Sequence, residues 1–208
     1  LLLCYFLWNV WTMRRLTKSR ADTVMELERS TALIQCVTEL SSHEDVDQAI
    51  NNLLKIVTAY FQGDRTYIFE MDYEEKLVHN TYEYAAAGVT REIENLRNVP
   101  IQIIQTWIDM FHERGMFYIS DLDREKEKED ARAYEVLKAQ NINSLIAVPF
   151  KKNGVVTGFF GVDNPREHYR DFELLSSIQF FIMNRLETRS RQEQLQYLSY
   201  RDMLTNLY

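Results

Sequence analysis

Side chains that carry out nucleophilic, acid–base or metal chemistry are few in this sequence and do not cluster. Its two cysteines, Cys4 and Cys36, indicate neither a disulfide framework nor a metal cluster. The four histidines fall on separate predicted elements, at positions 43, 79, 112 and 168. We therefore predict no catalytic residue, no metal site, no cofactor and no enzymatic activity in the chain itself.

Bulk composition describes an ordinary globular protein. The chain has 208 residues, 46% of them hydrophobic and 12% aromatic, which suffices for one core with extensions. Its net charge of −7 and the lack of a basic stripe argue against nucleic acid as a partner. Because the last residues break off within a motif, the chain is interpreted as part of a longer protein.

The most apolar stretch of the chain predicts a β-hairpin. Two apolar runs, Leu145–Phe150 and Val155–Val162, flank a turn that contains Asn153 and Gly154. Asn-Gly is a strong hairpin signal because both residues tolerate positive φ. Each run is apolar on both faces, which favours central strands covered by helices on two sides.

The remaining elements supply the cover for this hairpin. Patterns of apolar residues and turn formers predict an α+β fold, in which an antiparallel sheet carries the terminal helices on one face and short helices on the other. The predicted order begins with a long helix over 16–60, with a candidate break near Ser41 and Ser42, and two strands, 65–72 and 77–84. It continues with a helix from Pro100 to Glu113, a strand 116–120, a solvated charged loop 121–130, a helix 131–140, the hairpin, and a helix from Asp171 to Tyr200.

Residues 1–15 predict the end of a transmembrane helix. The run Leu1–Met13 is almost wholly apolar, contains Trp8 and Trp11, and is followed at once by Arg14 and Arg15. This charge placement puts the following residues on the cytoplasmic side of the inner membrane. Thirteen helical residues span about 20 Å, short of the roughly 30 Å of a bilayer, so the alternative is an amphipathic or buried helix.

Residues 16–40 predict a signalling helix that forms a coiled coil. Val24, Leu27, Thr31 and Ile34 recur at three- and four-residue spacing, as along the seam of a two-stranded coil. A second seam is predicted on the last helix, at positions that include Ile182. The two seams predict a homodimer, and its geometry is predicted to be parallel because both chains would enter from the same membrane.

The order of elements and four short stretches resemble the GAF domain, a cytoplasmic sensory fold. The stretches are Tyr67–Glu70, Asn80–Tyr84 with Gly88, Ser144–Pro149 and Gly158–Asp163. The resemblance covers residues 31–187. It implies a GAF-like antiparallel sheet and a site for a small-molecule ligand between this sheet and the short helices.

Six residues are predicted to contact this ligand. Tyr82, Tyr84, Trp107 and Phe159 would form the walls of an apolar site, and Glu70 and Asp163 stand at the ends of apolar strands, where they would supply polar contacts. The alternative for each of the six is core packing or solvation at a strand end. No pocket cysteine is present for bilin attachment or for methionine sulfoxide reduction.

Residues 188–208 are interpreted as a linker helix and the start of a GGDEF domain. Asp202, Leu204, Thr205 and Leu207 match the opening of diguanylate cyclase domains, although Asn206 replaces a glycine. The resemblance implies that the parent protein uses GTP and Mg²⁺ to make cyclic di-GMP. The combined interpretation is a membrane-tethered GAF sensory module that controls a cyclase. The alternatives are a ligand-free structural dimerisation module and a redox or haem sensor with His79 or His112 as ligand.

Overall fold

The computed structural model describes residues 2–125 and 131–205. Two predicted segments fall partly outside this description, namely the charged loop 121–130 and the cyclase-like end 202–208. Within the loop, a short helix, α4 (Leu122–Glu125), replaces the predicted irregular structure.

A six-stranded antiparallel sheet forms the centre of the domain, in the order β3-β2-β1-β6-β5-β4. The predicted hairpin is confirmed: β5 and β6 pair through a turn in which Asn153 and Gly154 have φ values of 52° and 82°. The strands are β1 (Arg65–Asp72), β2 (Leu77–Ala85), β3 (Val99–Pro100), β4 (Phe117–Ile119), β5 (Leu145–Lys152) and β6 (Val155–Asp163).

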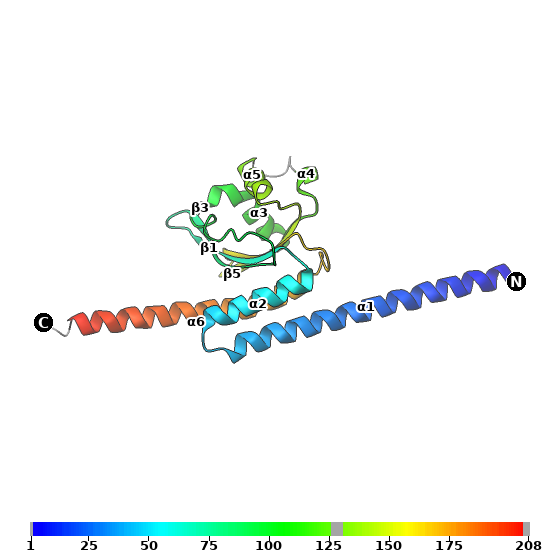
Figure 1. Ribbon diagram of the computed structural model, residues 1–208, viewed down its shortest axis with the longest axis horizontal. Helices are drawn as coiled ribbons and strands as arrows, with labels where there is room; N and C mark the ends of the chain where they lie inside the picture. The colour runs from blue at the N-terminus through cyan, green and yellow to red at the C-terminus, as the bar shows by residue number, and fades with distance from the viewer. Residues whose placement is uncertain (1, 126–130, 206–208) are drawn as a thin grey trace.

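Helices cover both faces of this sheet, as the predicted α+β class requires (Figure 1). The long helices lie on one face and bury one apolar cluster, while the short helices lie on the other and bury a second. The first group is α1 (Leu2–Ser42), α2 (Val46–Phe61) and α6 (Phe172–Thr205); the second is the 3₁₀ helix η1 (Ile101–Ile104), α3 (Gln105–Arg114) and α5 (Ala131–Ala139).

Local sequence signals explain where these helices begin and end. The α2 N-cap is Asp45, whose carboxylate accepts hydrogen bonds from the backbone N–H groups of Asp47 and Gln48. Gly115, with φ of 70°, ends α3 as predicted. The helix predicted to start at Pro100 begins instead as η1, with Pro100 itself in β3.

Successive residues of β1 point alternately to the two helix layers, so one face of the strand packs under the short helices and the other under the long helices. Tyr67 and Phe69 belong to the apolar cluster under the short helices, whereas Ile68 belongs to the cluster under the long helices. On β2 the register shifts between the partners of Ile68 and Phe69, so that Thr81 has no direct partner on β1.

The sequence-based location at the inner membrane is wrong for the described chain. Among the helices of residues 2–125 and 131–205, none is both long and apolar enough to cross a bilayer. The apolar run at the start belongs to α1, which continues unbroken through Arg14, Arg15 and Lys18 to Ser42.

Helix α1 carries two different apolar faces. Ala32, Cys36 and Leu40 pack into the cluster shared with α2 and α6, while the predicted seam points outward, with Leu27 67% and Ile34 66% exposed. On α6, by contrast, Ile182 is fully buried against the sheet within the same chain. Leu27 and Ile34 are therefore exposed on the surface of the single chain, whereas Ile182 is not.

Candidate functional site

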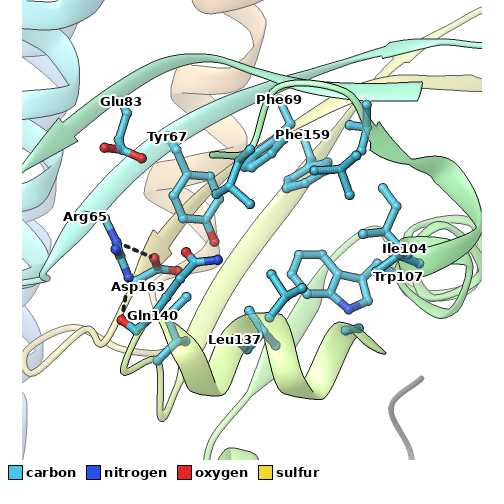
Figure 2. Close-up of a pocket in the computed structure, with 17 residues that line it drawn as sticks. Arg65, Tyr67, Phe69, Glu83, Ile104, Trp107, Leu137, Gln140, Phe159 and Asp163 are labelled. Atoms are coloured by element: carbon cyan, nitrogen blue, oxygen red, sulfur yellow. Dashed lines mark hydrogen bonds and ion pairs between the residues drawn. The ribbon is translucent and has the colours of Figure 1, made fainter. Parts of the chain in front are cut away.

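A small cavity lies between the sheet and the short helices, at the place where the family resemblance located a ligand (Figure 2). Its volume is about 60 Å³, well below the roughly 300–1,000 Å³ of common small-molecule pockets. The lining is apolar apart from one end and consists of Arg65, Tyr67, Phe69, Val78, Glu83, Leu96, Val99, Ile103, Ile104, Trp107, Ala133, Val136, Leu137, Gln140, Ile142, Phe159 and Asp163.

Aromatic rings form the wall at one end of the cavity. Phe69 and Phe159 are cross-strand partners on β1 and β6, and their rings stack with centroids 4.7 Å apart. Trp107 of α3 meets Phe159 edge to face at 5.7 Å and stacks on Phe117 at 4.5 Å. The ring contacts fix the orientation of each wall residue.

A buried ion pair forms the opposite, polar end. Arg65 and Asp163 are direct register partners on β1 and β6, and Arg65 Nε donates to Asp163 Oδ2 at 3.1 Å. The remaining guanidinium nitrogens donate to the backbone oxygens of Thr90 at 3.2 Å and Gln140 at 3.0 Å. Arg65 therefore has a partner for each of its nitrogens and is held rigidly by three segments of the chain.

The Asp163 carboxyl is only partly satisfied by this arrangement. Asp163 is 2% exposed, and its Oδ1 has no hydrogen-bond partner among the described residues. Burial raises the pKa of Asp163 to about 7, although the Arg65 charge acts in the opposite direction. The pKa of the neighbouring Glu83 is also raised by burial, although its carboxylate accepts hydrogen bonds from Asn80 and from the Glu92 backbone.

A glycine makes room for the aromatic ring between these charges. Tyr67 is the register partner of Gly161 on β6 and of Glu83 on β2. A Cβ atom on Gly161 would lie 2.7 Å from the Tyr67 ring, so any side chain there would displace Tyr67 from the cavity wall. Figure 2 shows the Tyr67 hydroxyl directed toward Asp163 and Gln140.

Three of the six predicted ligand residues line this cavity and three do not. Trp107, Phe159 and Asp163 lie together in its wall. Glu70 lies on the other face of the sheet, because it is one residue out of phase with Phe69 along β1. Tyr82 and Tyr84 pack against the long helices, on the same face as Ile68.

Glu70 and Tyr82 instead take part in a polar contact with the last helix. Arg189 of α6 donates to both Glu70 carboxylate oxygens at 3.0 Å and to the Tyr82 hydroxyl at 2.8 Å. The Tyr82 hydroxyl in turn donates to the carboxylate of Asp47, in the first turn of α2. We call Arg189, Glu70, Tyr82 and Asp47 the α6 clasp, since they join α6 to β1, β2 and α2.

Sequence reasoning missed Arg65, Tyr67 and Glu83 in the cavity. The positions of Arg65 and Tyr67 could have been predicted from the alternation along β1, because Arg65, Tyr67 and Phe69 are spaced two residues apart and share one face. The position of Glu83 beside Tyr67 depends on the pairing of β1 with β2, and this register has no local signal in the sequence. No cavity-lining residue in the described chain is a cysteine or histidine, and no group of described residues could hold a metal ion.

The fold and the cavity define an α+β domain that encloses a small internal space between its sheet and its short helices. The sequence matches the GAF domain family over residues 45–186, which is more than half of its length, and the chain belongs to this family. No curated protein matches the chain.

Solved structures with the same fold share little sequence with this chain. One is the far-red-absorbing dark state of a protein with bound biliverdin IXα, with a TM-score of 0.62 and 14% identity over 76% of this chain and 98% of that chain. Another is a phycoerythrobilin-bound GAF domain from a cyanobacterial phytochrome, with a TM-score of 0.58 and 14% identity over 81% and 97%. A third is free methionine-R-sulfoxide reductase from Neisseria meningitidis with its substrate, with a TM-score of 0.59 and 14% identity over 79% and 91%.

The cavity of this chain does not fit a bilin. A linear tetrapyrrole is several times larger than the 60 Å³ available. None of the described residues that line the cavity is a cysteine that could attach a bilin, and Cys36 is buried on the other side of the sheet among the long helices. Burial also raises the pKa of the Cys36 thiol to about 12, which makes it a poor nucleophile.

Proposed function

We propose that this GAF domain is a sensory module in which a small molecule binds the internal cavity and changes the position of α6. The observation that carries this proposal is the buried Asp163 oxygen without a partner, which faces an apolar cavity. An unpaired buried polar atom costs about 1–3 kcal/mol, and a bound molecule would offset this cost. Trp107, Phe159 and Asp163 are the predicted ligand residues that this proposal retains.

Strand β1 supplies a short route from the cavity to α6. Phe69 stacks in the cavity wall, and the next residue, Glu70, binds Arg189 of α6 on the opposite face. A ligand that moves Phe69 would therefore also move Glu70 and change its contact with Arg189. Because the α6 clasp also includes α2, such a shift changes how α6 is held by two elements at once.

We further propose that α6 leads to a diguanylate cyclase domain in the parent protein. The resemblance of residues 202–208 to the opening of such domains supports this proposal. Cyclase chemistry joins two GTP molecules held at facing sites, so the relative position of two α6 helices is a natural point of control. GTP and Mg²⁺ would be bound by that domain and not by the chain described here.

A ligand screen and a nucleotide assay together test this function. Thermal unfolding of the chain in a broad panel of small metabolites should reveal at least one stabilising compound, and Trp107→Ala should weaken its effect. A longer version of the protein that continues through the next domain should convert GTP and Mg²⁺ to cyclic di-GMP, seen by chromatography. If no compound stabilises the chain, the alternative of a purely structural dimerisation module is favoured.

We propose that the assembly is a parallel homodimer formed along the outward face of α1. Val24, Leu27 and Ile34 form an exposed apolar row on this helix. Leu27→Glu should convert the dimer to monomers by light scattering, without loss of helical circular dichroism. Glu26→Gln, one position away and at an exposed site, is the matched control and should leave the mass unchanged. A dimer that survives Leu27→Glu would place the interface elsewhere.

A further inference from the structure

We propose that the molecule bound in this cavity is a small, flat cation that donates N–H hydrogen bonds, of the amidinium, guanidinium or imidazolium type. This inference rests on the proposed function, in which the cavity is the ligand site, and it assigns the chemical class of the ligand. Three properties of the cavity lead to it: the unsatisfied acceptor, the state of the surrounding charges, and the size and shape of the space.

The unsatisfied group is an acceptor, so the ligand must supply a donor. Asp163 Oδ1 is buried without a hydrogen-bond partner, while Oδ2 is occupied by Arg65. The Tyr67 hydroxyl is directed toward this carboxyl (Figure 2) and lowers the pKa of Asp163 against the effect of burial, but Oδ1 still has no hydrogen-bond partner among the described residues. An N–H group that points at Oδ1 would satisfy the carboxylate and favour its ionised form.

The charges around Asp163 leave no site for an anion. Arg65 already donates to Asp163 and to the backbone oxygens of Thr90 and Gln140. Arg91, which is largely exposed, lies 3.8 Å from Glu83 outside the cavity lining. A carboxylate or phosphate in the cavity would meet two acidic side chains, Asp163 and Glu83, without an uncommitted cation.

The shape of the space favours a flat ligand of few atoms. A volume of about 60 Å³ is less than half of the roughly 150 Å³ cavity that accepts benzene. The parallel rings of Phe69 and Phe159 and the Trp107 indole offer aromatic surfaces on which a planar cation can rest. A group with a flat apolar edge and an N–H edge matches the two ends of the cavity.

Three molecules of nearly identical shape test the ligand class. Acetamidinium, acetamide and acetate each have four non-hydrogen atoms, but they carry positive, zero and negative charge. Titrations would follow the fluorescence of Trp107 in a Trp8→Phe, Trp11→Phe background, since those two tryptophans are exposed and far along α1. We expect acetamidinium to bind at least tenfold more tightly than acetate at pH 8, with acetamide in between.

The pH dependence identifies the group that binds the probe. Acetamidinium keeps its charge between pH 5.5 and 8.5, whereas the pKa of Asp163 is about 7. Its affinity should therefore fall about tenfold per pH unit below 7, as Asp163 is protonated. Tyr67, Glu83 and Glu92 also face this region. Glu83→Gln should weaken acetamidinium binding because it removes a neighbouring negative charge, but the fall in affinity below pH 7 should remain, since Asp163 is retained.

Substitution at Asp163 completes the test. Asp163→Asn should abolish the preference for acetamidinium over acetamide. If this variant does not fold, the pH dependence of binding to the unchanged protein tests the role of Asp163 instead. Equal binding of all three probes, or tightest binding of acetate, would overturn the assigned ligand class while leaving the cavity as a ligand site. Failure of every probe to bind, as expected if a resident water satisfies Oδ1, would overturn it as well. In both cases the metabolite screen decides the proposed function independently.

Discussion

Replacement of Arg65 by methionine is expected to lower the free energy of unfolding by about 3–5 kcal/mol, since it leaves the Asp163 carboxyl buried without its cation. Arg65 is 3% exposed, and it joins β1 to β6 and to the backbone at Thr90 and Gln140. Methionine keeps most of the side-chain volume, so the loss reports on the charge and its hydrogen bonds. Chemical denaturation followed by circular dichroism measures the change.

Two further variants show whether the pairing of charges is responsible. Arg91→Met removes an exposed cation near Glu83 and should cost less than about 1 kcal/mol. The double variant Arg65→Met, Asp163→Leu should recover much of the lost stability, because it removes both buried charges together. A loss for Arg65→Met as small as that for Arg91→Met would show that the pair contributes little to the fold.

Replacement of Arg189 by methionine is expected to speed amide hydrogen exchange about tenfold in α6 beyond residue 186. The Arg189 guanidinium donates to both oxygens of Glu70 and to the Tyr82 hydroxyl, and it is three-quarters buried. A charge-assisted contact of this kind is worth about 1.5 kcal/mol, which corresponds to a tenfold change in a local opening equilibrium. Exchange measured by mass spectrometry of peptides from α6 gives the result.

The same helix offers a matched control for this experiment. Arg191 lies two residues further along and pairs with Glu187 at 3.5 Å on the exposed surface. Arg191→Met should change exchange by less than about twofold. Equal effects of the two substitutions would mean that the α6 clasp does not hold the end of this helix, and the coupling route through Glu70 would then lose its support.

The sequence predicted the layers of this fold better than the faces of its strands. Asn153 and Gly154 between two apolar runs were sufficient to locate the central hairpin, because few other residues permit that turn. Glu70 lies outside the cavity because it is one position away from Phe69, and neighbours on a strand face opposite layers. Tyr82 also lies on the face opposite to the cavity, next to a bulge at Thr81 that local sequence patterns do not reveal.

The polar end of the cavity was the least predictable part of the site. Arg65 looks like a solvated residue at the start of a strand, and its burial depends on a partner 98 positions away in the sequence. Asp163 was chosen for its place at the end of an apolar strand, but its unsatisfied oxygen follows from the full set of tertiary contacts. Long-range pairings of this kind have no local signature.

Helix α6 is one continuous helix, and its contacts with the domain fix which of its faces points toward the sheet. It runs 34 residues without a break, about 51 Å at 1.5 Å per residue, and extends away from the sheet in the direction opposite to the start of α1 (Figure 1). Each residue added beyond the clasp would turn whatever follows by about 100°, whereas seven residues would return it to nearly the same angle. The length of this helix therefore sets a direction as well as a distance.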